Sequence, residues 1–105
     1  MDSINDKTSY FVTVYFWDEN GQAVTPNSGT YRLDSDNGIE IIASTPFTPS
    51  TTNYTISIPY TSNYILDNSK TFEIRKLTVI WLYNGSTSQG TYEWQYIINN
   101  LKGVT

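Results

Sequence analysis

The stretch YFVTVYFW, residues 10–17, decides the fold class of this chain. It consists entirely of β-branched and aromatic residues, which favour extended strands over helices. It stops at DENG, residues 18–21, where the Asn-Gly pair supplies the positive φ angles that tight turns require. The stretch therefore predicts a β-strand that ends in a turn, and the rest of the chain repeats this pattern.

Two further runs flank the next turn signal. TYRLD, residues 30–34, places Tyr31 and Leu33 on one face, and IEIIAS, residues 39–44, follows after the turn sequence SDNG. Together these runs predict a β-hairpin. Pro46 and Pro49 then mark a connection that leaves the sheet and crosses to a second one, because each proline removes a backbone donor from the strand ladder.

The second half of the chain predicts three more strands. NYTISI, residues 53–58, alternates between apolar and polar side chains, and LTVIWLY, residues 77–83, is the most apolar run of the chain. The run at residues 91–99 follows the loop at residues 84–90, so the last two runs predict a second hairpin. Residues 62–69 fit either a short helical turn or an irregular crossing.

These runs indicate about seven short strands with turn signals between them and no helical period. The sequence thus predicts an all-β fold, a single antiparallel β-sandwich of the immunoglobulin or fibronectin type III kind. A chain of 105 residues fits one domain, expected to span residues 1–105 with residues 1–9 as an extended N-terminal arm. The aromatic residues expected in its core and rim are Tyr31, Tyr54, Tyr92, Trp94 and Tyr96.

Charge and composition exclude several classes of protein. Only 15% of the residues are charged and the net charge is −4, which argues against binding to nucleic-acid phosphates. The absence of cysteine excludes disulfides and thiolate metal sites. No window approaches the roughly 18 apolar residues of a membrane span, and the first residues lack the pattern of a secretory signal. We therefore expect a protein that is made in the cytoplasm and is neither secreted nor bound to a membrane.

The sequence also lacks the side chains that most catalytic sites use. Histidine and cysteine are absent, which removes the commonest general base and the thiol nucleophile. A catalytic carboxylate pair needs one pKa raised by burial, whereas the acidic residues here are expected in water. They are Asp18, Glu19, Asp34 and Asp36 in turns, and Glu40, Glu73 and Glu93 at outward strand positions. The chain is predicted not to be an enzyme.

The segment DSDNG, residues 34–38, offers oxygen ligands at alternate positions, as the first half of a calcium-binding loop does. It lacks the later bidentate glutamate of such a loop. Asp, Asn and Gly are also the residues that a tight turn requires, so we favour a hairpin turn. No metal ion or other cofactor is expected.

Two strands carry bulky side chains on both of their faces. In residues 10–17 the even positions are Val12, Val14 and Phe16, and the odd positions include Phe11, Tyr15 and Trp17. In the strand from Leu77 the set Leu77, Val79, Trp81 and Tyr83 is opposed by Ile80 and Leu82. A two-layer sandwich buries only one face of each sheet, so one face of each strand needs another cover.

The cover could be the ends of the chain itself, residues 1–9 or 101–105, or another protein. Three aromatic side chains can present about 450–750 Å². The largest apolar patch of a typical monomer is about 300–600 Å². We therefore favour contact with another protein, through a predicted interface of Phe11, Tyr15, Trp17, Ile80 and Leu82.

The patterns VYFWDENG (residues 14–21) and AVTPNSGTYRL (residues 23–33) resemble the opening of small bacteriophage proteins with immunoglobulin-like sandwiches. LTV (residues 77–79) and YIINNLKGV (residues 96–104) are similar to the last two strands of that group. The resemblance implies a non-catalytic structural protein of the virion that acts as a head–tail adaptor, decoration or fibre-attachment component. It also implies that the partners are other virion proteins and copies of the chain itself.

Two rival classes remain open at this point, a carbohydrate-binding module and a free-standing cytoplasmic adaptor. A carbohydrate-binding module would stack its ligand on an exposed aromatic ring, with Trp17 and Trp81 as the candidates. Such modules usually occur attached to an enzyme or in a secreted protein, and neither circumstance is evident in this sequence.

Overall fold

The computed structural model describes residues 1–101, and this part of the chain is all-β, as predicted. It forms seven strands and one short 3-10 helix, η1, at Tyr60–Ser62. The strands are β1 (Asp2–Asn5), β2 (Tyr10–Tyr15), β3 (Ser28–Ser35), β4 (Glu40–Phe47), β5 (Asn53–Ile58), β6 (Phe72–Tyr83) and β7 (Ser88–Asn99).

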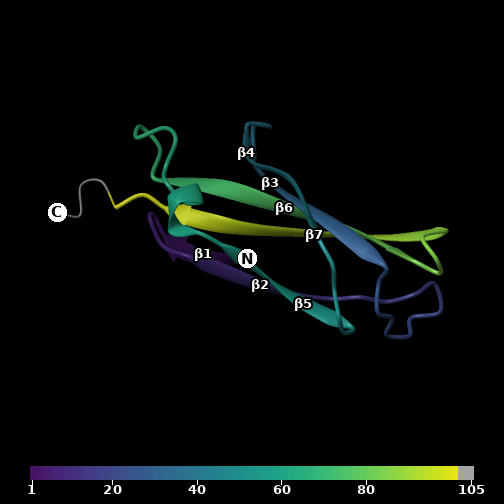
Figure 1. The fold of residues 1–105 in the computed structure, drawn as a ribbon. Helices are drawn as coiled ribbons and strands as arrows, with labels where there is room; N and C mark the ends of the chain where they lie inside the picture. Colours follow the sequence, from purple (N-terminus) through teal and green to yellow (C-terminus); the bar gives the residue numbers. More distant parts are fainter. Residues whose placement is uncertain (102–105) are drawn as a thin grey trace.

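The strands form two sheets that lie along the long axis of the molecule (Figure 1). One sheet has five strands in the order β1-β7-β6-β3-β4, and the other consists of β2 and β5. Both predicted hairpins, β3–β4 and β6–β7, are present, and the chain crosses to the second sheet after β4, as predicted. Only the pairing of β1 with β7 is parallel among the strand pairs of residues 1–101.

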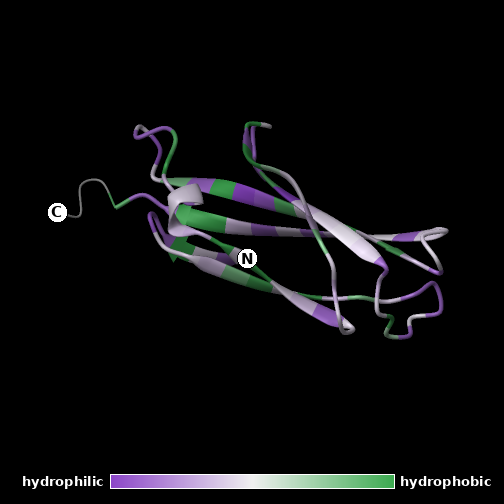
Figure 2. Ribbon diagram, in the orientation of Figure 1, coloured by the Kyte–Doolittle hydropathy of each residue, from purple (hydrophilic) through white to green (hydrophobic). Residues whose placement is uncertain are grey.

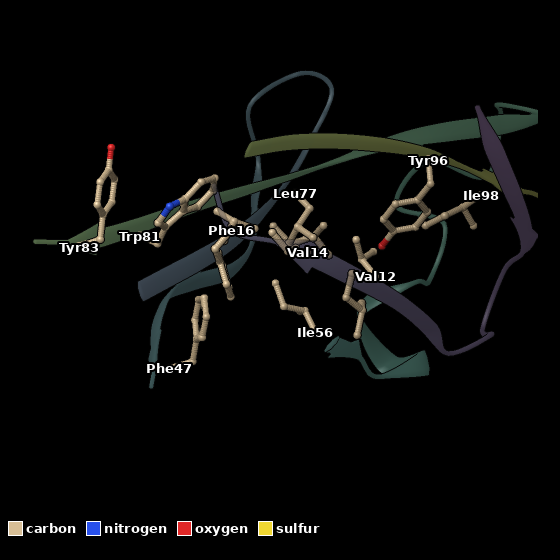
Figure 3. Packing of buried hydrophobic residues seen from close by; sticks show 13 residues of the cluster. Val12, Val14, Phe16, Phe47, Ile56, Leu77, Trp81, Tyr83, Tyr96 and Ile98 are labelled. Atoms are coloured by element: carbon tan, nitrogen blue, oxygen red, sulfur yellow. The ribbon is translucent and has the colours of Figure 1, made fainter. Parts of the chain in front are cut away.

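The core lies between the two sheets and is filled by alternate residues of the facing strands (Figure 3). The smaller sheet contributes Val12, Val14 and Phe16, of which at most 5% is exposed. The larger sheet contributes Leu33, Leu77, Val79, Trp81, Tyr83, Tyr96 and Ile98. Buried and more exposed residues alternate along β2 and β6, so the alternation predicted for residues 10–17 and for the strand from Leu77 is confirmed. Figure 2 shows the hydropathy of each residue along the strands.

The aromatic residues expected in the core and rim lie there, with different degrees of burial. Tyr96 is fully buried, whereas Tyr31, Tyr54, Tyr92 and Trp94 are half-buried and pack against the core. The half-buried position of Tyr92 and Trp94 shows that the smaller sheet does not cover the whole inner face of β7.

β4 continues through Pro46 to Phe47, beyond the point where the sequence predicted that the chain leaves the sheet. Pro46 lies opposite Thr30 of β3, and β4 is an edge strand, where proline is tolerated because one side of the strand has no neighbour. The ring of Phe47 then stacks on Tyr54 with 4.5 Å between the centroids. The end of β4 thereby closes the core over β5.

Residues 1–9, expected as an extended arm, contribute a strand to the larger sheet. β1 adds to the edge of β7, with Asp2 opposite Tyr96 and Asn5 opposite Asn99. The backbone N–H of Asp6 then donates to the carbonyl of Asn99 at 2.9 Å. This N-terminal segment is therefore tied to the end of the domain where β7 finishes.

Glu73 is buried, and the prediction that it faces outward is wrong. It is 6% exposed and forms an ion pair at 2.9 Å with Arg75, which is 0% exposed. Both side chains form hydrogen bonds with the backbone of the irregular crossing at residues 62–69, which precedes β6. Glu73 accepts hydrogen bonds from the N–H groups of Leu66 and Asp67, and Arg75 donates to the carbonyl of Tyr64 at 2.7 Å. Buried charges need such partners, so the ion pair and the crossing depend on each other.

Residues 62–69 begin at the end of η1 and continue as an irregular crossing. Asn63, fully buried, anchors this crossing to the core. The hydroxyl of Tyr96 donates to its Oδ1 at 2.7 Å, and its Nδ2 donates to the carbonyl of Thr8 at 2.7 Å. One side chain thus connects the crossing, β7 and the segment before β2.

The Glu73 carboxylate makes the stability of the fold depend on acidic pH. Burial alone would raise the pKa of Glu73 above its usual 4.5, but hydrogen bonds from Leu66, Asp67 and Arg75 outweigh burial and lower the pKa. Its stabilising contribution is therefore fully present above about pH 4.5 and is lost as the pH falls through the lowered pKa.

We expect the melting temperature of the wild-type chain to fall more steeply than that of Glu73→Gln between about pH 4.5 and pH 2.5. Circular dichroism melting of both proteins over this range measures the difference. Parallel pH profiles would show that the Glu73 carboxylate does not contribute in this way.

Candidate functional site

Three aromatic side chains are exposed on the outer side of the smaller sheet. Phe11 is 62% exposed, Tyr15 57% and Trp17 51%, and we call these three residues the aromatic face. Phe11 and Tyr15 belong to β2, whose other side supplies the core residues, so the strand's alternation places them away from the core. Polar residues of β5 flank the face, and Thr13 is hydrogen-bonded to Thr55 at 2.9 Å across the strands.

A turn held by hydrogen bonds extends the aromatic face beyond β2. Trp17 pairs with Ala23 in an antiparallel bridge. Between them the Asp18 carboxylate accepts hydrogen bonds from the N–H groups of Asn20 and Gln22, at 2.9 and 3.0 Å. Gly21 has φ of 76°, as predicted for the Asn-Gly turn. The position of Trp17 is therefore set by the turn.

The other two residues of the predicted interface lie on the opposite side of the molecule. Ile80 and Leu82 project from the outer side of the larger sheet, because the residues that alternate with them in β6 face the core. They are half-buried and line a shallow depression of about 120 Å³ together with Ser28 and Thr30. The five predicted residues therefore form two separate surfaces.

The N-terminal end of the chain does not cover the aromatic face. β1 lies at the edge of β7 in the other sheet, and more than half of each side chain of the aromatic face remains exposed. The other proposed cover, residues 101–105, falls outside the described residues except for Leu101.

A groove of about 500 Å³ lies between the two sheets, next to the aromatic face. We call it the inter-sheet groove. It runs between β2 and the first half of β7, where neither strand has a neighbouring strand on that side in the described part of the chain. Its lining includes Thr13, Tyr15 and Trp17 on one side, Gly90 and Tyr92 on the other, and Trp81 at its base.

Trp81 packs at the base of this groove with only 5% of its surface exposed. A Cβ atom on Gly90 would overlap the indole ring, so the ring lies against the backbone of β7. Phe16 meets it from the core side with 5.2 Å between the ring centroids. The prediction that Trp81 could serve as an exposed stacking platform for a sugar is therefore wrong, whereas Trp17 remains exposed.

One end of the inter-sheet groove is acidic. Asp18 and Glu19 both line it there, and the hydroxyl of Tyr83 donates to Glu19 at 2.7 Å. This hydrogen bond to the carboxylate raises the pKa of Tyr83 above its ordinary value. Among the residues that the structure describes, neither lysine nor arginine lines the groove. The groove therefore favours neutral or cationic groups at this end.

A set of hydrogen bonds connects β1, β2 and β7 beyond the other end of the groove. The indole N–H of Trp94 donates to the hydroxyl of Tyr10 at 2.9 Å, and this hydroxyl donates to Asp2 at 2.7 Å. Burial and the hydrogen bond to Asp2 raise the pKa of Tyr10 to about 12. These contacts connect Asp2, at the start of β1, to β2 and β7, the two strands between which the groove runs.

The segment at residues 34–38 is a hairpin turn, the interpretation favoured over a calcium loop. Ser35 accepts a hydrogen bond from the N–H of Ile39 through its hydroxyl and contacts the side chain of Asn37, while Asp34 pairs with Arg32 at 2.8 Å. Residues 1–101 contain no group of three or more acidic residues placed to hold a metal ion. They also contain no helix long and apolar enough to cross a membrane.

Sequence reasoning found the aromatic face but missed the inter-sheet groove. The signals in the sequence were Gly90, at the end of the predicted loop, and the aromatic Tyr92 that follows it. Their role depends on which strands lie opposite them, which the local sequence does not reveal. Comparison of the chain with known protein families, curated proteins and solved structures finds no match.

Proposed function

We propose that this chain is a non-catalytic assembly protein of a bacteriophage virion, which contacts other proteins through its aromatic face. The observation that carries the proposal is the exposure of Phe11, Tyr15 and Trp17 along one strand and the turn that follows it. Large aromatic side chains are enriched at protein interfaces, where they supply much of the binding energy.

The size of the aromatic face fits the centre of an interface. Each aromatic side chain has about 150–250 Å² of surface, so side chains that are 51–62% exposed present on the order of 300 Å² together. This area is smaller than the about 450–750 Å² expected from the sequence and lies within the about 300–600 Å² of the largest apolar patch on a typical monomer. A standard interface buries about 800 Å² on each partner. The flanking residues Asn53, Thr55 and Ser57, all exposed on β5, supply a polar rim of the kind such interfaces have.

An immunoglobulin-type arrangement is part of the proposal, and the strand order supports it. In that fold one sheet holds four strands in the order C′, C, F and G, and the second sheet contains B and E. β4, β3, β6 and β7 follow the first order, and β2 and β5 correspond to the second pair. The cysteines and the tryptophan of the antibody domains are absent at the matching positions.

Assignment to the virion is supported by the resemblance of the strand and turn patterns to small phage structural proteins. It is tested by mass spectrometry of purified particles of a phage whose genome encodes this sequence. The proposal expects the chain in particles at a copy number that is constant between preparations. Its consistent absence from intact particles would exclude a role as adaptor, decoration or fibre-attachment protein.

Glutamate at position 11 or 15 is expected to abolish assembly and to leave the fold intact. Both side chains are more than half exposed, so a charge there costs little in the isolated chain but must be desolvated in an interface. Incorporation into particles, with light scattering of the purified chain, measures assembly for Phe11→Glu and Tyr15→Glu. Circular dichroism melting of the same variants measures the fold.

Val14→Glu is the matched control, because Val14 lies in the same strand and is 0% exposed. A buried, unpaired carboxylate there should cost several kcal/mol and unfold a domain whose total stability is about 5–15 kcal/mol. Folded Phe11→Glu and Tyr15→Glu variants that still enter particles normally would contradict the proposed contact surface.

A further inference from the structure

The edge of β7 has a covered part and an open part. Residues 96–99 pair with β1, whereas residues 88–95 have β6 on one side and, within residues 1–101, no strand on the other. The inter-sheet groove lies along this open part.

The hydrogen bonds at the end of β7 show which backbone groups point toward the open side. The carbonyl of Asn99 accepts from Asp6, beside β1, whereas the N–H of Asn100 donates to Thr71, on the β6 side. Backbone groups of successive residues in a strand point to opposite sides. The β6–β7 register is unbroken from Asn99 to Ser88, so the odd-numbered residues point away from β6 throughout.

Gln89, Thr91 and Glu93 therefore present their N–H and C=O groups at the open edge beside the groove. Within residues 1–101 these groups have no strand to pair with. The odd-numbered residues of β2 present a second open edge across the groove, because Phe16 directs its N–H to Thr52 on the β5 side. Two unpaired strand edges thus face one cavity.

The base of the groove has an unused donor as well. The indole Nε1 of Trp81 is buried and has no hydrogen-bond partner in the part of the chain that the structure describes. Buried polar groups usually have a partner, and leaving one without costs about 1–3 kcal/mol. The open edges beside the groove therefore favour a ligand whose backbone both donates and accepts hydrogen bonds.

We propose that the inter-sheet groove receives an extended segment of a partner protein, which pairs with the open edge of β7 in line with β1. β1 shows that this edge accepts a strand, and the groove continues in the same line. Side chains at alternate positions of the segment lie over Tyr92 and Trp81 and are apolar.

The acidic side chains in the groove lining determine which charged residues the partner segment carries. Asp18 and Glu19 line one end of the groove, and none of the basic side chains within residues 1–101 lines any part of it. The segment therefore carries lysine or arginine at that end. Tyr15 and Trp17 belong both to the aromatic face and to the groove lining. The proposal still goes beyond the contact surface proposed above, because Thr91 lies outside the aromatic face and Phe11 lies outside the groove.

Thr91→Pro tests the proposal, with Thr91→Ala as its control. Proline removes the N–H that points to the open edge and leaves the hydrogen bonds to β6 in place, whereas alanine keeps the N–H. The probe is a fluorescent peptide of about seven residues that alternates valine and threonine and carries one terminal lysine. Fluorescence anisotropy measures its binding.

We expect the wild-type chain and Thr91→Ala to bind the peptide within about twofold of each other and Thr91→Pro to bind it at least about tenfold more weakly. The same peptide with glutamate in place of lysine should also bind more weakly. Hydrogen exchange of the wild-type chain should show that the peptide slows the amides of Gln89, Thr91 and Glu93. Phe11→Glu should bind the peptide normally, which separates this site from the aromatic face.

Equal binding by Thr91→Pro, or no binding by the wild-type chain at about 1 mM peptide, would overturn the proposal. If Thr91→Pro does not fold, unchanged exchange of the three amides in the wild-type complex would overturn it instead. Binding of a neutral oligosaccharide in the groove without binding of the peptide would replace it with a carbohydrate site.

Discussion

Replacement of Arg75 by methionine is expected to lower the free energy of unfolding by about 3–5 kcal/mol. The change leaves the Glu73 carboxylate buried without its cation, and it removes the hydrogen bond that Arg75 donates to Tyr64. Loss of this magnitude approaches the whole stability of many domains, which is about 5–15 kcal/mol. Urea unfolding followed by tryptophan fluorescence measures it.

The control for this prediction is the double variant Glu73→Gln/Arg75→Met. Glutamine is uncharged and keeps an acceptor oxygen for the N–H groups of Leu66 and Asp67, so the double variant should recover part of the lost stability. If the double variant is less stable than Arg75→Met, the uncompensated charge is not the cause of the loss.

Asn63→Leu is expected to cost about 1–3 kcal/mol, because the buried hydroxyl of Tyr96 loses its partner, whereas Thr8 is exposed and its carbonyl can bond to water. The hydroxyl of Tyr96 and the carbonyl of Thr8 both bond to the Asn63 side chain, and leucine offers neither a donor nor an acceptor. The loss should appear in thermal melting as a decrease of several degrees for each kcal/mol, given the size of the domain.

Tyr96→Phe provides the matched comparison, since it removes the hydroxyl and leaves Asn63 in place. It should cost less than Asn63→Leu, because only the bond to Oδ1 is lost. A loss below about 0.5 kcal/mol for Asn63→Leu would show that water or a rearranged crossing satisfies the freed groups.

Strand alternation made the outer and inner sides of β2 predictable from sequence. Val12, Val14 and Phe16 are buried and Phe11, Tyr15 and Trp17 are exposed, since side chains alternate across a strand whatever its partners are. The all-β class and both hairpins are also confirmed, because turn residues and apolar runs are local signals.

The buried polar residues could not be predicted in this way. Glu73 and Arg75 look like surface residues of a strand, and their burial depends on donors and acceptors from a crossing that lies elsewhere in the sequence. The inter-sheet groove likewise depends on which strands lack neighbours, a property of the sheet order. Pro46 remained in a strand because β4 lies at an edge, which the local sequence does not reveal.

The most direct test of the proposed function compares the solvent exposure of the aromatic face in the free chain and in assembled particles. Hydroxyl-radical footprinting with mass spectrometry measures the oxidation of Phe11, Tyr15 and Trp17 separately. The proposed function predicts strong oxidation of all three in the free chain, where each is more than half exposed, and marked protection in particles. Equal oxidation in the free chain and in particles that contain it would contradict the proposal that this face is the assembly surface.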